Sequence, residues 1–566
     1  MQQSKRIANT LLVVGAIVGA SGCRPDRPTE PLTNALVIQG AIVPALPETI
    51  RDEERGFAEI SRAAPGAAGY YVDEAGNLVL LLRDQSEDGA ARAALTQIKT
   101  EGRLLTPAAR NRRIVVKAAQ FSYGQLATWR DRLFDSVFTQ LDGVSSLDLD
   151  ERRNRVTIGL DPQLAADLRP RVLKTAAGLG VDTSAINFRE RGNVRYSSST
   201  TTSAAVLGLT IQHAFDTIVG GIQIRSPAAQ GMGGNPGFCT VGFVALRNGV
   251  RTFVTATHCS SNWGAIDNTV MSQAGVGRRI GAEYIDPNKW SCGFYDYCRE
   301  SDAAMYSIDD TVDALHGLIA RTTYANNGYL NGGVGSLVID SLRPYFVVTV
   351  AGQSLPSGWY VNKMGITTGW TWGTVENTCV DHHNGTWPGR YTTTCAYEAD
   401  LREDPGDSGG PVFTLEGGDA VGLVGTIIGS NGDYAVFSRY SRIVSEMGGT
   451  IQTVRGVNLS TPSNIGGSVS GEHPVVSWNA VSGATHYYVY AQRYLFTGYD
   501  EWGNPTYELG GSEYRGVTTA ASFTDTEQWV SCAGFCSSPP DEIYYFVRAR
   551  SKTDVSPWSS SVTFGL

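Results

Sequence analysis

The spacing of hydrophobic residues separates an α/β stretch from two β-rich stretches. Between residues 111 and 192 the apolar positions change from strand to helical spacing and back. Ser122 stands where an N-cap would begin the first helix, and Asn154 stands between two alternating runs, as in a hairpin. The predicted elements are a strand over 114–119, a helix over 122–141, strands over 146–150 and 155–160, and a helix over 162–179.

A long stretch from Gly237 to Ile443 carries short apolar, β-branched runs separated by Gly, Asn and Asp. Residues 243–246 and 252–255 flank Asn248-Gly249, a dipeptide that favours a hairpin turn. Many short strands with turn signals and no strong helix predict an antiparallel barrel or sandwich.

The N-terminal region is less regular. Lys5 and Arg6 precede an apolar run over 7–20 that is too short to span a membrane, which predicts an export signal over 1–22. Residues 23–110 are rich in Pro, Ala and charge and have weak periodicity, so we expect a linker and a loosely packed unit there.

The signal ends in Ala20-Ser21-Gly22-Cys23, which resembles a bacterial lipobox with Cys23 as its lipidated residue. Ala20 departs from the Leu that this motif prefers. An acylated Cys23 would attach the protein to a membrane without spanning it. The alternative is an ordinary signal peptide followed by an incidental cysteine.

Composition places the chain outside the reducing cytoplasm. Nine cysteines leave eight once Cys23 is set aside, an even number that suits an oxidising compartment. Their close couples are Cys239 with Cys259, Cys292 with Cys298, Cys379 with Cys395, and Cys532 with Cys536. These spacings make no four-ligand zinc set, so no metal or cofactor is expected. The net charge of −9 gives no sign of a nucleic-acid partner.

Two strings carry candidate chemistry, Thr255-Ala256-Thr257-His258-Cys259 and Gly406-Asp407-Ser408-Gly409-Gly410-Pro411. A serine hydroxyl becomes a nucleophile when a nearby base removes its proton, and His258 is the candidate base. The glycine-rich turn around Ser408 lets backbone N–H groups point at a developing oxyanion.

Together the two strings resemble the chymotrypsin-like serine proteases. The resemblance implies an all-β double-barrel protease domain over 216–455 and a triad of His258, Asp302 and Ser408. Asp302 is favoured because small and apolar residues follow it; Asp296, Asp309 and Asp310 compete. The resemblance also implies that the backbone N–H groups of Gly406 and Ser408 form the oxyanion hole, that Asp407 is a structural brace, and that Cys239 pairs with Cys259.

The order His258, Asp302, Ser408 along the chain distinguishes a chymotrypsin-like protease from an α/β-hydrolase. Gly406–Gly410 also satisfies the G-x-S-x-G elbow, but those enzymes need the order Ser, acid, His on a strand-to-helix turn. His382-His383 beside Asp381 is a weaker candidate for metal binding, and we expect it in an exposed loop.

Two more strings resemble these proteases. Ile218-Val219-Gly220-Gly221 resembles a mature N-terminus, so we expect cleavage near 216–218, without committing to an Ile218–Asp407 ion pair. Lys363–Gly369 resembles a streptogrisin stretch, K-x-G-x-T-T-G.

The α/β unit, bounded at 111–215, stands where streptogrisin- and α-lytic-like enzymes carry a pro-region. The alternative is an independent adaptor domain.

Residues 460–566 resemble a fibronectin type III domain. The resemblance rests on Trp478 on an early strand and on the Y-x-x-V-x-A string Tyr544–Ala549, and it implies an all-β sandwich. It gives little information about a binding partner.

These features predict an exported serine endopeptidase, lipid-anchored or released after processing, made as a precursor and acting on proteins or peptides through an acyl-enzyme. A catalytically silent or self-processing-only surface adhesion protein is the alternative. Ile427 or Ile428 is expected to narrow the primary pocket and Arg402, Glu403 or Asp404 to lie near its base, so substrate preference stays open.

Overall fold

The computed structural model describes most of the chain beyond residue 54. The described residues are 55–100, 112–195, 209–226, 237–260, 262–273, 277–292, 296–327, 332–341, 343–384, 391–455, 459–500, 504–530, 541–550, 556 and 559–565. The expected signal peptide, Cys23, and the couple Cys532/Cys536 lie outside them. Among the described residues, no helix is long and apolar enough to span a bilayer.

Residues 55–100 and 112–118 form a folded α/β unit, where a linker and a loosely packed unit were expected over 23–110. Its elements are α1 (Arg55–Ala63), β1 (Ala67–Val72), β2 (Leu78–Leu82), α2 (Asp88–Thr100) and β3 (Ile114–Ala118), with sheet order β1-β2-β3. Every residue of the central strand β2 is buried. A fully buried strand is a continuous apolar run without alternation, so the periodicity that predicts strands is absent there.

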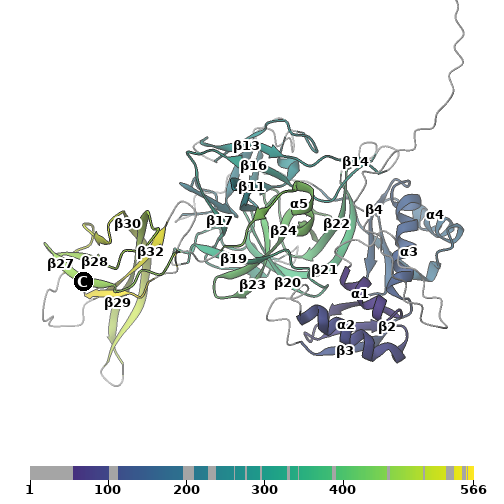
Figure 1. The fold of residues 1–566 in the computed structure, drawn as a ribbon, viewed down its shortest axis with the longest axis horizontal. Coiled ribbons are helices and arrows are strands. Elements are labelled where there is room, and N and C mark those ends of the chain that lie inside the picture. The colour runs from purple at the N-terminus through teal and green to yellow at the C-terminus, as the bar shows by residue number, and fades with distance from the viewer. Residues whose placement is uncertain are drawn as a thin grey trace, which may run out of the picture. The chain divides into compact units, whose positions relative to one another are not determined.

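The second α/β unit has the predicted helix, two strands and second helix in that order, but the strand predicted over 114–119 is β3 of the first sheet, and β6 (Ile186–Glu190) was not predicted. It contains α3 (Tyr123–Leu133), β4 (Val144–Asp150), β5 (Arg155–Leu160), α4 (Ala165–Gly178) and β6. Ser122 caps α3 in a capping box with Gln125, and Asn154 takes a positive φ of 54° in the β4–β5 turn. Figure 1 shows α3 and α4 beside β4. β4 pairs with a longer strand, β21, through Leu147↔Asp381 and Ser146↔His382.

Residues 209–455 contain most strands of two large β-networks, of which the first is antiparallel and the second is mixed. The first has the order β26-β10-β11-β16-β13-β12-β8-β9. Its strands are β8 (Gln223–Ser226), β9 (Gly237–Thr240), β10 (Phe243–Arg247), β11 (Val250–Thr255), β12 (Val270–Gln273), β13 (Arg279–Ile285), β16 (Ala304–Ile308) and β26 (Ile451–Gln452). The predicted hairpin is confirmed, since Arg247 pairs with Val250 around Asn248 and Gly249, both at positive φ.

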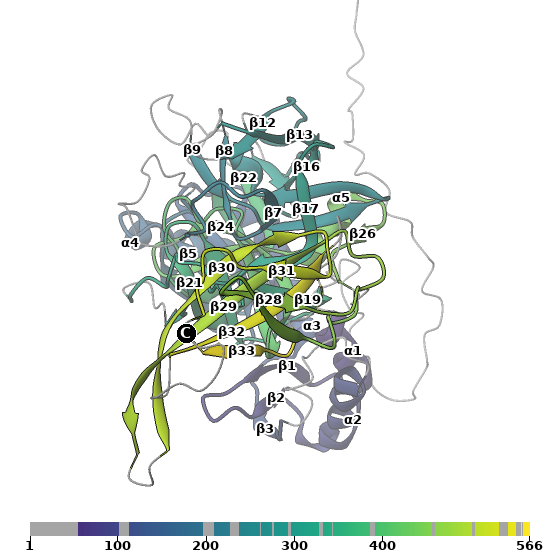
Figure 2. The same cartoon turned by 90° about the vertical axis from the view of Figure 1, so that its left-hand side faces the viewer.

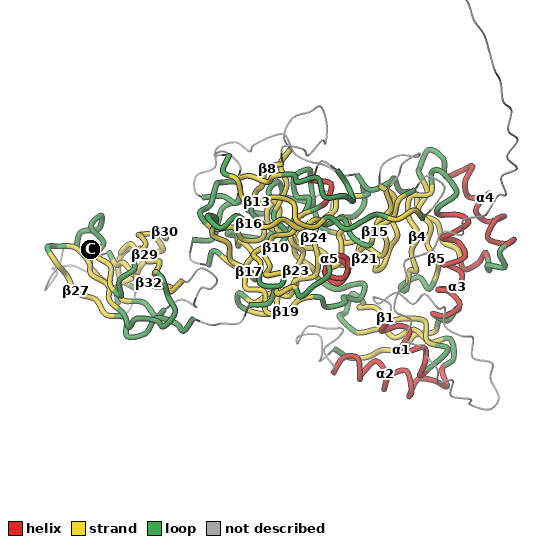
Figure 3. The backbone as a smooth tube through the Cα atoms, turned by 45° about the horizontal axis from the view of Figure 1, so that its top comes forward, coloured by secondary structure: helices red, strands yellow, loops and turns green. Residues whose placement is uncertain are grey.

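The second network runs β14-β15-β22-β25-β24-β23-β20-β21, with β4-β5-β6 at one edge and four strands branching from it. Its main strands are β14 (Trp290–Ser291), β15 (Tyr297–Arg299), β20 (Tyr360–Gly365), β21 (Gly369–Asn384), β22 (Tyr391–Asp400), β23 (Pro411–Gly417), β24 (Ala420–Ser430) and β25 (Ala435–Arg439). The branching strands are β7 (Thr217–Gly220), β17 (Asp313–Ala320), β18 (Asn326–Asn327) and β19 (Tyr345–Ala351). Figure 3 shows the helix α5 (Tyr440–Met447) among these strands.

This body begins before the predicted boundary at 216. Thr210 forms a β-bridge with Val338, and the N–H of Ile211 donates to the carbonyl of Leu337 at 3.0 Å. Ile211 is fully buried in the same apolar cluster as Ile218.

The C-terminal residues form two small sheets, as expected for a sandwich. One has the order β27 (Gly466–Ser470), β28 (His473–Ser477), β31 (Ser522–Thr524), and the other β30 (Pro505–Thr518), β29 (His486–Tyr499), β32 (Glu542–Arg550), β33 (Val562–Gly565). Trp478 is buried, and its ring meets Tyr487 edge to face at 5.1 Å. Figure 2 shows the long β29–β30 hairpin reaching beyond the other strands of these sheets.

Candidate active site

Strand pairing brings His258 and Asp302 together. β11 and β16 run antiparallel with Thr255 opposite Ala304, so the residues just after β11 meet those just before β16. His258 lies in the 3₁₀ turn Thr257–Cys259 that follows β11. Its Nδ1 is 2.5 Å from Oδ2 of Asp302, and its backbone N–H donates to Oδ1 of Asp302 at 3.2 Å.

The position of Asp302 is tightly defined. Its side chain is fully buried, and its backbone N–H donates to the Ser438 hydroxyl at 2.9 Å. A neutral imidazole that donates from Nδ1 to this carboxylate keeps Nε2 as an acceptor. That tautomer is the one needed to take a proton from a serine hydroxyl.

Ser408 lies in the loop between β22 and β23. Its side chain is fully buried, and Oγ donates to the carbonyl of Ile428 at 3.3 Å. The neighbouring Gly409 has φ +82°, and a Cβ there would come within 2.1 Å of Thr255 Oγ1 and 2.8 Å of the Ala256 N atom. The Ser408 loop is therefore packed against the segment that leads into His258, and only glycine permits that approach.

The Ser408 loop is also hydrogen-bonded to Thr240, the last residue of β9. The carbonyl of Ser408 accepts from the N–H of Thr240 at 2.9 Å, and the carbonyl of Gly406 accepts from the Thr240 hydroxyl at 2.8 Å. Cys239, the residue before Thr240, is disulfide-bonded to Cys259. The chain thus connects the serine loop to the histidine turn through one short segment.

Asp407 is braced by a lysine. Its carboxylate accepts from Lys363 Nζ at 2.9 Å and from the Thr368 hydroxyl at 2.6 Å, and both charged side chains are fully buried. The N–H groups of Thr367 and Asp404 also donate to it, at 2.8 and 3.1 Å. Lys363 thus supplies the cation for Asp407, while Ile218 is buried within β7.

Disulfides join three of the four predicted couples, Cys239–Cys259, Cys292–Cys298 and Cys379–Cys395.

The competing aspartates have other contacts. Asp309 pairs with Arg279 at 2.8 Å and Asp310 lies 3.6 Å from Arg251, whereas the carbonyl of Asp296 accepts from the N–H of Cys292. Gly406 has a φ of +106°, and its oxyanion-hole role with Ser408 stays a prediction.

The expected loop exposure of His382 and His383 is wrong. Both are buried in β21 because the strand continues through them. His383 stacks on Phe138 at 3.9 Å, with its two ring nitrogens 2.8 Å from the Thr392 hydroxyl and 2.9 Å from the Phe138 carbonyl. Burial lowers the pKa of His382. No group of three or more metal-ligating side chains occurs within the described ranges.

Three buried carboxylates near the Ser408 loop or beside Arg299 have raised pKa values. Burial raises the pKa of Glu403, five residues before Ser408, to about 7. It also raises the pKa values of Asp286 and Glu446, which lie on either side of Arg299. Ile427 and Ile428 are both fully buried in β24.

No family model matches the chain. Among solved structures, the Nocardiopsis protease NAPase is 20% identical, with a TM-score of 0.29 over 42% of this chain and 100% of that one. Protease A of Thermobifida fusca is 21% identical, with a TM-score of 0.28 over 42% and 100%. These two neighbours are bacterial serine proteases. A fibronectin structure, FN3tt mut, is 17% identical, with a TM-score of 0.10 over 19% and 90%.

Sequence reasoning missed three polar residues of this region. Ser438 bonds the backbone of Asp302, Lys363 neutralises Asp407, and Arg299 is fully buried beside the residues next to His258 and Asp302. The K-x-G-x-T-T-G string contained Lys363 without giving its role. Nothing in the local sequence marks Arg299 or Ser438.

Proposed function

We propose that this chain is a serine endopeptidase that hydrolyses peptide bonds through an acyl-enzyme. The observation that carries the proposal is the 2.5 Å contact between His258 and a fully buried Asp302, on a segment packed against the Ser408 loop. This juxtaposition supplies a base, a group that orients the base, and a nucleophile from three separate parts of the chain.

In the proposed reaction, Ser408 Oγ attacks the scissile carbonyl while Nε2 of His258 takes the hydroxyl proton. Asp302 holds the tautomer and stabilises the imidazolium. The N–H groups of Gly406 and Ser408 are proposed to bind the oxyanion, each donor contributing about 3–4 kcal/mol. His258 then protonates the leaving amine, and water releases the acyl group.

The experiment is incubation of residues 24–566 with casein, beside the Ser408→Ala variant, followed by labelling with a fluorophosphonate. Casein cleavage and labelling of Ser408, both lost in the variant, are expected. Labelling without casein turnover would favour a self-processing adhesion protein, and absence of both would favour a catalytically silent one.

The precursor proposal has three parts: export through residues 1–22, lipidation at Cys23 and maturation near Ile218. Because Thr217–Gly220 pairs with β17 and Ile218 is buried, a cut there has to precede formation of β7 or follow its local opening. N-terminal sequencing of the mature form tests the site, and a new terminus before Thr210 would contradict it. Mass spectrometry of the envelope-bound form tests lipidation.

Residues 111–215, which include the second α/β unit, are proposed as the pro-region. Its support is the pairing of β4 with β21, which joins this unit to the β21–β22 hairpin. Co-elution of separately expressed residues 55–195 with residues 209–566 would support this partnership. Independent elution would support the adaptor alternative.

A further inference from the structure

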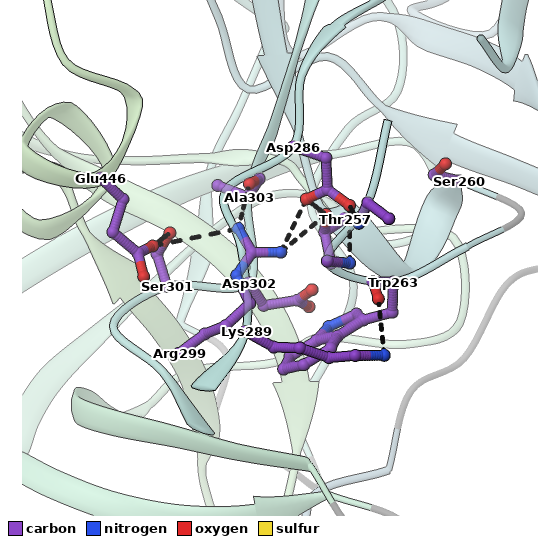
Figure 4. Close-up of polar contacts among 12 residues, drawn as sticks. Thr257, Ser260, Trp263, Asp286, Lys289, Arg299, Ser301, Asp302, Ala303 and Glu446 are labelled. Carbon is purple, nitrogen blue, oxygen red and sulfur yellow. Dashed lines mark hydrogen bonds and ion pairs between the residues drawn. The ribbon is translucent and has the colours of Figure 1, made fainter. Parts of the chain in front are cut away.

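A fully buried arginine lies directly behind His258 and Asp302. Neither Arg299 nor its ion-pair partner Asp286 has exposed side-chain area, and Arg299 Nη1 is 2.7 Å from Asp286 Oδ1. Figure 4 shows Arg299 between Asp286 and Thr257 on one side and Glu446 and Ser301 on the other. Burying an arginine costs free energy of desolvation, which its ion pair and hydrogen bonds must offset. The groups that accept those hydrogen bonds therefore show which segments Arg299 holds in place.

Two of those hydrogen bonds reach the immediate neighbours of the proposed triad. Nη1 donates to the hydroxyl of Thr257, the residue before His258, at 3.0 Å. Nη2 donates to the carbonyl of Ala303, the residue after Asp302, at 2.8 Å. Because the guanidinium is rigid and planar, it fixes the separation of the two backbone segments that it joins.

The surroundings of Arg299 restrict the guanidinium further. Its carbon lies 5.2 Å from the centre of the Trp263 ring, within range of a cation–π contact. Asp286 also accepts from the N–H groups of Gly264 and Ala265, at 2.6 and 2.9 Å. The anion that holds Arg299 is therefore itself held by backbone donors.

Glu446 holds the segment that leads into Asp302 through two hydrogen bonds. Glu446 accepts from the N–H of Glu300 at 2.7 Å and from the Ser301 hydroxyl at 2.6 Å, and its Oε2 lies 3.9 Å from Arg299 Nη2. Residues 300–303 thus have contacts at four successive positions, of which Arg299 makes the last.

Arg299 also connects the two large β-networks. It ends β15, which pairs in parallel with β22 through Arg299↔Thr393, in the network that carries the Ser408 loop. The residues that it binds, Thr257 and Ala303, flank β11 and β16 of the other network. An arginine at this junction sets how the His258 and Asp302 segments lie relative to the sheet that carries Ser408.

We propose that Arg299 is a positioning residue, which keeps His258 and Asp302 in the geometry for proton transfer without touching substrate. The kinetic part of this proposal rests on the proposed function. A displacement of about 1 Å at a catalytic group lowers rates by about 10²-fold. Arg299→Gln is therefore expected to lower kcat about 10²-fold while KM changes less than about two-fold, because substrate contacts are untouched.

The single variant leaves Asp286 buried without its cation, which by itself endangers folding. The deciding variant is therefore Arg299→Gln with Asp286→Asn, which removes both charges and leaves a polar amide at each position. Arg455→Gln is the matched control, because Arg455 is also buried but donates to the carbonyl of His316 and packs on Gly317, away from the triad.

A second readout does not need activity. In the Ser408→Ala full chain, the Nδ1 proton of His258 in its short bond to Asp302 is expected to give a strongly downfield proton NMR resonance. The resonance is expected to move upfield or disappear in the double variant and to persist with Arg455→Gln.

A folded double variant with lower kcat, unchanged KM and a displaced resonance would support the proposal. Wild-type kcat and resonance in that variant would overturn it, and so would failure of the double variant to fold, since Arg299 would then serve the fold itself. If the wild type hydrolyses nothing, the proposed function fails, while the resonance still decides the role of Arg299.

Discussion

Replacing Lys363 by methionine is expected to destabilise the Ser408 loop. The change keeps the length of the side chain and removes the cation that faces Asp407 at 2.9 Å. Both side chains are fully buried, so water cannot replace the lost charge without opening the structure. Breaking such a pair from one side costs about 3–5 kcal/mol.

The contacts of Asp407 indicate that the loss of stability in Lys363→Met lies near the lower limit of this range. Asp407 keeps its hydrogen bonds from the Thr368 hydroxyl and from the N–H groups of Thr367 and Asp404. These donors partly stabilise the carboxylate, so we expect a loss of about 3 kcal/mol. Asp407→Asn should cost at least as much, because Lys363 would keep only the Thr368 hydroxyl and the Gly369 carbonyl.

The assay is hydrogen–deuterium exchange of β20, read by mass spectrometry in the full Ser408→Ala chain. This readout reports the strand that contains Lys363 rather than the averaged unfolding of several domains. A loss of about 3 kcal/mol corresponds to exchange about 10²-fold faster in Lys363→Met. The double variant Lys363→Met with Asp407→Asn should lose less than the sum of the two single variants.

Arg402→Gln is the control, since Arg402 pairs with Asp404 in the same loop but both side chains are partly exposed. Its expected cost is below about 1 kcal/mol. If Lys363→Met exchanged no faster than Arg402→Gln, or if the two single losses simply added, the buried pair would not be what braces the loop.

Three further outcomes follow from the structure. Burial raises the pKa of Glu151 to about 8, so the folded state holds its proton more tightly than the unfolded chain and loses stability as pH rises from about 4.5 to 8. Glu151→Gln should therefore gain up to a few kcal/mol relative to wild type near pH 9 and little near pH 4, measured by urea unfolding. Replacing Cys239 and Cys259 by serine opens a loop of sequence separation 20 and should cost about 3 kcal/mol, seen as a lower urea midpoint. Ser438→Ala leaves the buried N–H of Asp302 without its acceptor and should cost about 1–3 kcal/mol, with exchange of β16 amides as the readout.

The sequence was most informative where the signal is local. The Ser122 cap, the turn at Asn154 and the hairpin at Asn248-Gly249 each depend on a few consecutive residues, and the structure has all three. The juxtaposition of His258 and Asp302 is also an expectation of the sequence, from the resemblance to chymotrypsin-like proteases and from the small and apolar residues that follow Asp302. These are positions where backbone conformation or reaction chemistry restricts residue type directly.

The features that the sequence did not predict have a common physical origin, which is burial that depends on tertiary packing. Residues 78–82 form a central strand whose apolar run has no alternation, and His382 and His383 are covered only after β21 has paired with its neighbours. Arg and Lys are usually exposed, so a single sequence gives no reason to place Arg299 or Lys363 in the interior.

The distribution of buried charge explains why the two cations stand beside the proposed triad rather than in it. Lys363 neutralises Asp407 and Arg299 neutralises Asp286, whereas among the described residues the side chain in short contact with the Asp302 carboxylate is the His258 imidazole, which is a cation only when protonated. While His258 is neutral, Asp302 is a buried charge stabilised by hydrogen bonds rather than by a cation, a state with a considerable free-energy cost. Protonation of His258 during the reaction would supply the missing cation, so Asp302 stabilises the imidazolium more than the resting state. A cation in direct contact with Asp302 would remove that difference, and Arg299 avoids it by binding the Ala303 carbonyl instead of the Asp302 carboxylate.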